Sequence, residues 1–333
     1  MDPLTQGVLG AALPQATRSR LHVGIAGTLG FLAGLTADLD VLISSDTDPL
    51  LFLQYHRHFT HSLIFVPVGG ALCALALHAV LGRRRRLSFA QTLLFCTLGY
   101  ATHPLIDAAT SYGTLLLWPF SDTRYDWSII SVIDPLFTLP VLVLVAISAI
   151  RRRPGPARLA LAWAGFYLAV GAFQHHQALA MGREVAASRG HTPVRIEAKP
   201  SFGNIVVWRV IYQTAERFYV DGVRATFAPR VFEGGSVLKL EPARDLPWLD
   251  PASQQARDVQ RFAWFSQGFV ALDPEHPYRV IDVRYATLPN DIPSLWSIEL
   301  SPDAAPDAHI LYLTHRRDIH ESLAILWRMI NVR

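Results

Sequence analysis

Long apolar runs dominate roughly the first 180 residues of the chain, whereas the remaining residues are mixed in polarity. An α-helix needs about 20 predominantly apolar residues to cross a bilayer. A shorter run, Pro3–Ala16, predicts a helix at the N-terminus, and its length leaves open whether that helix crosses the membrane. Five longer runs each predict a membrane-crossing helix: Leu21–Ile43, Ser62–Gly82, Ser88–Ala109, Val132–Ile150 and Ala157–Met181.

The pattern changes at about Arg183, where short alternating segments replace the long runs. Helical periodicity returns at Ser253–Ser266 and Ile319–Ile330. The sequence therefore predicts an α-helical membrane bundle over residues 1–182, with five long helices plus a short N-terminal helix, followed by a small α+β extramembrane domain over residues 183–333. Strands rich in β-branched and aromatic residues are predicted at Ile205–Tyr212, Phe218–Phe227, Tyr278–Ala286 and Trp296–Leu300.

The composition also indicates a membrane protein. Of the 333 residues, 51% are hydrophobic and 17% are charged, which is too apolar for an ordinary soluble enzyme of this size. The net charge is +3, but the basic residues form short clusters beside apolar runs, so no nucleic-acid partner is expected. Cys73 and Cys96 lie inside apolar runs, and neither a disulfide framework nor a cysteine zinc motif is expected. The opening residues lack a basic segment, so no cleavable signal peptide is expected.

Three arginine clusters predict the orientation of the helices. Arg18 and Arg20 precede the first long run, Arg83–Arg86 follow the second, and Arg151–Arg153 follow the fourth. Successive clusters are separated by two crossings, so all three fall on one side of the membrane. The positive-inside rule assigns that side to the cytoplasm. The opposite helix ends and the C-terminal domain are therefore expected to face the periplasm or the cell exterior.

Aspartate and histidine residues gather at the predicted outer ends of these helices. Ionisable groups at membrane depth are expensive, about 2.5 to 3.5 kcal/mol for an aspartate at the centre of a helix. A cation that neutralises them makes such a cluster tolerable, and imidazole with carboxylate is a common zinc ligand set. The predicted ligands are Asp38, Asp40, His56, His61, His103 and Asp107.

The spacing of these residues favours ligation. His103 and Asp107 are four residues apart, so both side chains point from one face of a helix. Six ligands exceed the three protein ligands and one water typical of a catalytic zinc. A two-metal site is therefore plausible, in which the ions lower the pKa of water and clamp an ester or phosphoryl oxygen.

Four further residues are predicted to assist. Arg57 is expected to bind an anionic substrate group, and Thr60 and Ser62 are expected to hydrogen-bond to the ligands. Asp134 precedes a proline at a helix start, where it serves either as a site residue or simply as a cap.

Each ligand pair also has a simpler interpretation. His103 and Asp107 could form a hydrogen bond between helices, and His56 and His61 could lie in a solvated loop. The pair Asp38 and Asp40 could merely terminate a helix. We favour ligation because these simpler interpretations do not explain why all the groups gather at one membrane face.

The sequence around these residues resembles that of the YdjM-like membrane-bound, metal-dependent hydrolases of bacteria. The resemblance covers the membrane half and extends more weakly to Val207-Trp208-Arg209 and Asp282-Val283-Arg284-Tyr285. The chain is also distantly similar to zinc-dependent phospholipases C, which place a His-x-x-x-Asp pair on a helix. The matching motifs are Asp2-Pro3-Leu4-Thr5, Asp38-Leu39-Asp40, His56-Arg57, Thr60-His61-Ser62, His103-Pro104 with Asp107, Trp118-Pro119 and Asp134-Pro135.

The resemblance implies a multi-pass protein of the bacterial inner membrane that holds divalent metal, zinc first among the choices. The chain departs from the family pattern at Gln6, where a histidine is expected, and this neutral amide predicts weaker metal binding there. His58 stands where a small residue is expected and ranks below His56 and His61 as a ligand.

The expected function is hydrolysis of a phosphoester or related ester by metal-activated water. A site at the outer membrane face suggests a lipid or lipid-linked substrate, and membrane lipids are the expected partners. The alternative is an ion- or proton-coupled transporter that uses the intramembrane His/Asp cluster. A third hypothesis is a membrane anchor that displays the outer domain and holds a structural metal.

Overall fold

The protein forms two compact units in the computed structural model, which describes residues 1–17, 22–226, 228–315 and 318–331. Unit 1 contains Met1–Leu42, Tyr55–Ala172 and Phe202–Asn204. Unit 2 contains Ile43–Gln54, Phe173–Ser201 and Ile205–Arg333. The predicted domain boundary at 182/183 falls within the long helix that contributes to both units, and it stays a prediction. Arg18, Arg20, Leu21 and Phe227, which entered the sequence predictions, lie outside the described residues.

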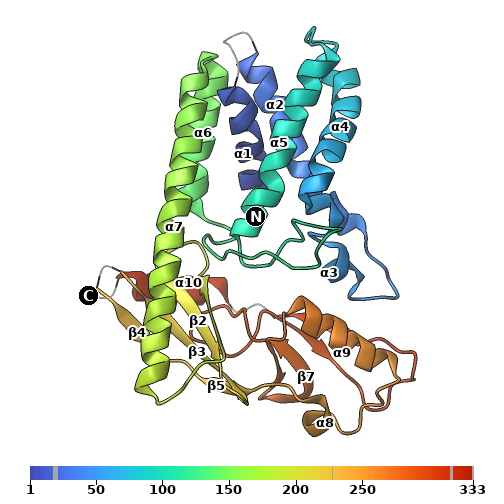
Figure 1. The fold of residues 1–333 in the computed structure, drawn as a ribbon, viewed down its shortest axis with the longest axis vertical. Helices are drawn as coiled ribbons and strands as arrows, with labels where there is room; N and C mark the ends of the chain where they lie inside the picture. The colour runs from blue at the N-terminus through green and yellow to red at the C-terminus, as the bar shows by residue number, and fades with distance from the viewer. Residues whose placement is uncertain (18–21, 227, 316–317, 332–333) are drawn as a thin grey trace. The chain divides into compact units, whose positions relative to one another are not determined.

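Unit 1 is helical, and Figure 1 shows α1, α2, α4, α5 and α6 running alongside one another. Short 3₁₀ turns, η1 to η3, and a π-helical turn, η4, interrupt or extend these helices. Its elements are α1 (Pro3–Ala16), α2 (Val23–Leu35), η1 (Thr36–Leu42), η2 (Phe59–His61), η3 (Leu63–Phe65), α4 (Val66–Leu77), η4 (His78–Gly82), α5 (Phe89–Ala109), α6 (Pro135–Arg151) and the first half of α7 (Pro154–Ser188). The short helix α3 (Leu51–Tyr55) belongs to unit 2 except for its last residue.

Local sequence determines where the helices of unit 1 begin. The Asp2 carboxylate accepts a hydrogen bond from the Thr5 amide at 3.1 Å, and Pro3 occupies the first helical position of α1. Ser88 starts α5 through a capping box in which its hydroxyl accepts from the Gln91 amide. Asp134 starts α6 in the same manner as Asp2, followed directly by a proline.

Glycines allow α1, α2 and α5 to pack closely. A Cβ atom at Gly30 of α2 would lie 2.2 Å from the Gly10 carbonyl oxygen of α1, and one at Gly99 of α5 would lie 2.3 Å from the Gly30 carbonyl oxygen. Small residues permit this backbone approach between membrane helices. The approach fixes α5, which carries His103 and Asp107, against α2, which leads directly into η1 with Asp38 and Asp40.

Three helices among the described residues are long and apolar enough to cross a membrane: Val23–Leu42, Leu63–Gly82 and Pro154–Ser188. The prediction of five long crossing helices is therefore confirmed only for these three. The helix α6 has 17 residues, which is short for a span, and α5 has 21 residues but carries polar side chains such as His103 and Asp107. The predicted orientation of the helices stays a prediction.

Unit 2 contains the predicted β-sheets, but in two antiparallel sheets with more strands than the sequence indicated. The first has the order β1-β2-β3-β4, with β5 also paired to β3, and the second has the order β6-β7-β8-β9. The strands are β1 (Arg195–Pro200), β2 (Val207–Gln213), β3 (Arg217–Arg224), β4 (Arg230–Phe232), β5 (Ser236–Leu238), β6 (Val270–Asp273), β7 (His276–Asp282), β8 (Trp296–Glu299) and β9 (Leu311–Thr314).

Three helices accompany the strands of unit 2: α8 (Pro242–Asp245), α9 (Gln254–Phe265) and α10 (Ile319–Asn331). The apolar face of α9 packs Phe262 against Val280 and Ile298 of the second sheet. Arg209 of β2 is buried and donates hydrogen bonds to the backbone carbonyls of Val283, Leu288, Pro289 and Asp291. Arg209 therefore ties the first sheet to the segment that follows β7.

Candidate metal centre

Four ligand side chains converge at the end of α2 and α5. Asp38 comes from η1, His61 from η2, and His103 and Asp107 from α5, one turn apart. One ligand atom from each lies within 4.8 Å of all the others. His61, His103 and Asp107 have fully buried side chains, whereas that of Asp38 is 26% exposed. The i, i+4 spacing on α5 thus places its two ligands on one face, as the sequence predicts.

The separations of these atoms match the edges of a small coordination sphere. The two Nε2 atoms of His61 and His103 are 3.0 Å apart. Asp38 Oδ1 lies 3.4 Å and 3.3 Å from them, and Asp107 Oδ2 lies 3.3 Å and 3.6 Å from them. A tetrahedron with metal–ligand bonds of about 2.0 to 2.1 Å has edges of about 3.3 to 3.4 Å. The side chains are therefore spaced to fit one ion of zinc size.

Hydrogen bonds orient both imidazoles with Nε2 toward this centre. Nδ1 of His103 lies 2.6 Å from the Gly34 carbonyl oxygen, which can only accept, so Nδ1 carries the proton. Nδ1 of His61 lies 3.2 Å from Asp40 Oδ2, a carboxylate partner of the kind that supports metal-binding histidines. If both rings are neutral, the lone pair of each Nε2 atom then points at the other Nε2 atom. Such an arrangement requires either a metal ion between the two atoms or a proton on one of them.

The charge of the cluster points the same way. Burial of His61 disfavours its protonated form, but the surrounding carboxylates outweigh this and raise its pKa to about 10. Asp107 Oδ2 is buried and accepts no well-aligned hydrogen bond, although Arg57 Nε lies 3.1 Å away and both imidazoles face it. A divalent ion at this point would satisfy that oxygen, and the residues present therefore fit a metal.

A second group of three ligands shares Asp38 with the first. It consists of Asp38, Asp40 and His56, again with one atom of each within 4.8 Å of the others. Nδ1 of His56 lies 2.8 Å from Asp40 Oδ1, and the His56 side chain is 34% exposed. The two groups together contain all six predicted ligands, and the second group is the one that reaches the surface of unit 1.

Two of the predicted assisting residues contact the ligands. The Thr60 hydroxyl donates to Asp40 Oδ2 at 2.8 Å. Arg57 is buried, with Nε 3.1 Å from Asp107 Oδ2, and its backbone amide donates to Asp40 Oδ2 at 2.9 Å. Its φ of 62° lies in the left-handed region that non-glycine residues rarely adopt, so the surrounding structure holds it there. Arg57 therefore balances the charge of the cluster, and its binding of an anionic substrate group stays a prediction.

The other two predicted assisting residues lie outside the two ligand groups. The Ser62 hydroxyl donates to the Phe59 carbonyl at 2.7 Å. The Asp134 carboxylate caps α6 and accepts a hydrogen bond from the Tyr167 hydroxyl at 2.9 Å. The contacts of Asp134 thus match its simpler interpretation as a cap, and its role in a site stays a prediction. His58 is also outside the groups, with its ring 5.6 Å from that of Trp118.

Several supporting contacts were not predicted from the sequence, although Gln6 stands where the family resemblance implies a histidine. Gln6 is fully buried and donates through Nε2 to Asp107 Oδ1 at 2.7 Å, so it orients a ligand. The Met1 amino group also contacts Asp107 Oδ1. Thr110, three residues after Asp107 on the same helical face, accepts from Arg57 Nη1 at 2.9 Å. Helical periodicity on α5 could have indicated Thr110, whereas Gln6 comes from a different helix.

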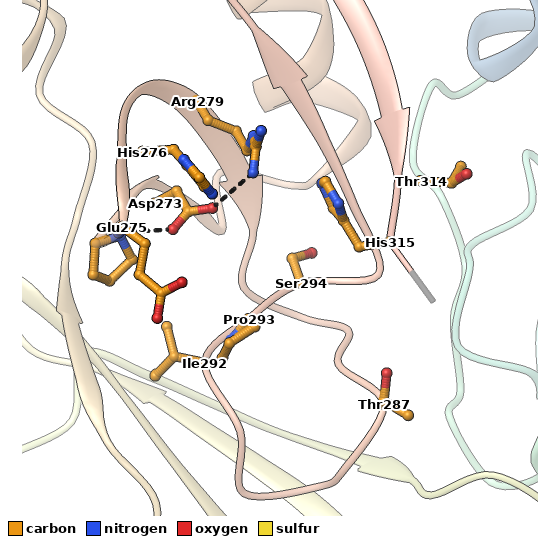
Figure 2. Close-up of a pocket in the computed structure, with 11 residues that line it drawn as sticks. Asp273, Glu275, His276, Arg279, Thr287, Ile292, Pro293, Ser294, Thr314 and His315 are labelled. Atoms are coloured by element: carbon orange, nitrogen blue, oxygen red, sulfur yellow. Dashed lines mark hydrogen bonds and ion pairs between the residues drawn. The ribbon is translucent and has the colours of Figure 1, made fainter. Parts of the chain in front are cut away.

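A separate pocket of about 600 Å³ lies within unit 2. Figure 2 shows Asp273 between the Arg279 guanidinium and the backbone of Glu275, with His276 and His315 nearby. Arg279 pairs with Glu299 at 2.7 Å and with Asp273 at 3.6 Å. These pairings balance the charge of Arg279, and we assign no ligand to this pocket.

Comparison with known proteins gives the family. The model of the YdjM inner membrane protein family matches residues 1–178. The chain belongs to the YdjM inner membrane protein family. The resemblance drawn from the sequence motifs is thereby confirmed, and the YdjM match contains every residue of both ligand groups.

One relative of this YdjM family member is the inner membrane protein YbcI of Escherichia coli strain K12. It is 39% identical over 108 residues, which are 31% of this chain and 60% of YbcI. The aligned part is therefore less than two thirds of the length of that relative. The family, the relative and the apolar helices together support an inner-membrane location. No solved structure matches the chain significantly.

Proposed function

We propose that this YdjM family member is a metal-dependent hydrolase of the inner membrane that cleaves a phosphoester or related ester of a lipid or lipid-linked substrate. The observation that carries the proposal is the convergence of His61, His103, Asp38 and Asp107 at separations of 3.0 to 3.6 Å. A bound divalent ion supplies Lewis-acid activation of water near neutral pH.

The two groups differ in the way that structural and catalytic sites differ. The first offers four protein ligands, which is the number found in closed structural zinc sites. The second offers three, which is the number found in catalytic sites that keep one position open. Its members His56 and Asp38 are also the partly exposed ones, so substrate access is expected on that side. Asp38 belongs to both groups and would contribute to each if both held an ion, and Asp38, Asp40 and His56 would hold the ion that activates water.

The residues around the ligands hold this arrangement in place. Asp40 accepts hydrogen bonds from the Arg57 amide and the Thr60 hydroxyl. These bonds fix its carboxylate beside the imidazoles of His56 and His61. The Arg57 side chain offsets one negative charge beside Asp107. The lipid character of the substrate rests on the membrane location, and cleavage at the periplasmic side rests on the predicted orientation.

The first test is elemental analysis of the purified full chain, followed by assays with phosphoester and phospholipid substrates. We expect bound transition metal, reduced by His61→Ala and Asp107→Ala, with turnover lost in both variants. His58→Ala is the matched control, because it lies in the same loop outside both groups, and it is expected to retain metal. Unchanged metal content in both ligand variants would contradict the assignment. Retained metal with ion flux and no turnover would favour the transport alternative.

A further inference from the structure

An apolar stripe runs along the exposed side of α10 in unit 2. Ile319, Leu323 and Trp327 follow one another at intervals of four residues, so they lie on one side of the helix. They are 58%, 42% and 66% exposed. The adjacent face of α10 is already used, because Leu326 and Met329 pack against Val207 of β2. The apolar arc of α10 is thus wider than the part that the sheet covers.

Contacts between β2 and α7 show which part of α7 lies beside the end of the first sheet on which α10 packs. The rings of His175 and Trp208 are 5.6 Å apart, a Cβ at Gly182 would lie 2.5 Å from Val210, and Nδ1 of His191 lies 2.9 Å from the Tyr212 hydroxyl. Residues later in α7, and His191 three residues beyond its end, therefore contact residues later in β2. The Val207 end of β2, on which α10 packs, lies beside the start of the unit 2 part of α7.

A second chain of contacts gives the same position. Arg224 of β3 donates to the backbone carbonyls of Met329 and Ile330 in α10, at 3.4 and 2.8 Å. Two residues later, the Thr226 hydroxyl donates to the Gln174 side chain of α7. The C-terminal end of α10 is thereby held close to Gln174.

Gln174 marks the point where α7 leaves its apolar segment. The helix has 35 residues, about 52 Å at 1.5 Å per residue, whereas the hydrocarbon core of a bilayer is about 30 Å thick. Apolar residues up to Phe173 are followed by the polar run Gln174-His175-His176-Gln177. The membrane surface is therefore expected near Gln174, at the level where the contacts above hold α10.

We propose that α10 lies in the membrane interface, with Ile319, Leu323 and Trp327 inserted into the surface of the phospholipid bilayer that α7 spans. Tryptophan is enriched at membrane–water interfaces, and amphipathic helices bury their apolar face about 5 to 10 Å into that zone. Because α7 already tethers unit 2 to the membrane, three apolar side chains suffice for a stable contact. The stripe fixes unit 2 against the bilayer.

The test places nitroxide labels on α10 in the full chain, reconstituted in phosphatidylethanolamine/phosphatidylglycerol vesicles. Leu323→Cys and Trp327→Cys report on the stripe, while Glu321→Cys and Arg328→Cys are matched controls on the exposed polar side of the same helix. All four positions are exposed, so the substitutions leave the core intact. Cys73 and Cys96 are buried, and the parent chain measures any labelling of them.

The readout is the ratio of accessibility to oxygen, which partitions into lipid, over accessibility to a water-soluble nickel complex. We expect this ratio to be about threefold higher or more at 323 and 327 than at 321 and 328. Equal ratios at all four positions would show that the stripe faces water and would overturn the proposal. Exclusion of both reagents at 323 and 327 would show that protein covers the stripe, either a second copy or another partner, and would overturn it as well.

Discussion

Replacement of Asp40 by asparagine should affect the two ions of the proposed centre differently, so it tests the two-ion assignment. Asp40 is 2% exposed, and it contributes Oδ1 toward His56 at 2.8 Å and Oδ2 toward Nδ1 of His61 at 3.2 Å. It is thus a ligand in the second group and the orienting partner of His61 in the first. Asparagine keeps the shape and one accepting oxygen but removes the charge. We expect Asp40→Asn to lose the ion held by His56 and to weaken the remaining ion.

The size of the second effect follows from the kind of contact that is lost. Removal of a carboxylate that hydrogen-bonds to a metal-binding histidine typically weakens metal affinity 10- to 100-fold, about 1.4 to 2.7 kcal/mol. Titration of the purified chain against a competing chelator gives the number of ions and their affinities. Asp46→Asn, an exposed aspartate, is the control and should behave like the parent chain. Two ions of unchanged affinity in Asp40→Asn would refute the reasoning.

Three further changes test the fold and the site. The Arg284 guanidinium is fully buried and lies 2.7 Å from the Asp282 carboxylate, so Asp282→Asn removes its counter-charge. This substitution should lower the free energy of unfolding of unit 2 by about 3 to 5 kcal/mol, measured by denaturant unfolding. The control Asp273→Asn changes a partly exposed carboxylate and should not lower it. Gly99→Val should prevent close packing of α5 on α2 and abolish a monodisperse peak in size-exclusion chromatography, whereas Gly24→Ala, with open space at its Cβ, should leave the peak unchanged. Metal removal by a chelator should lower the melting temperature of the parent chain and lower that of His61→Ala by less, because an ion that binds only the folded state stabilises it and His61 belongs to only one of the two groups.

The membrane half could be predicted from the sequence because its signals are local. Apolar length and the His103/Asp107 spacing depend on one helix at a time, and the structure brings those two side chains together. The prediction of five crossing helices is confirmed for three segments of the described residues, because the polar side chains of α5 and the short length of α6 weaken the other two. An apolar run alone does not distinguish a span from a helix that packs inside a bundle.

Contacts between distant elements could not be predicted. Asp107 receives a hydrogen bond from Gln6, 101 residues earlier, and no periodicity connects the two positions. The strands β4 and β5 have only three residues each, too few to show an alternating pattern. The motif that contains Arg209 resembled the family without an evident role. The structure shows that this side chain spans to backbone carbonyls that follow β7, a contact that depends on the sheet arrangement.

X-ray absorption at the zinc edge of the zinc-loaded, purified chain tests the central claim most directly, because it reports the ligands of the ion itself. The account predicts nitrogen and oxygen neighbours at about 2.0 to 2.1 Å with the outer-shell scattering of imidazole, and loss of imidazole scattering in His103→Ala. A sulfur neighbour at about 2.3 Å, or a spectrum without imidazole that His103→Ala leaves unchanged, would contradict a metal centre built from Asp38, His61, His103 and Asp107.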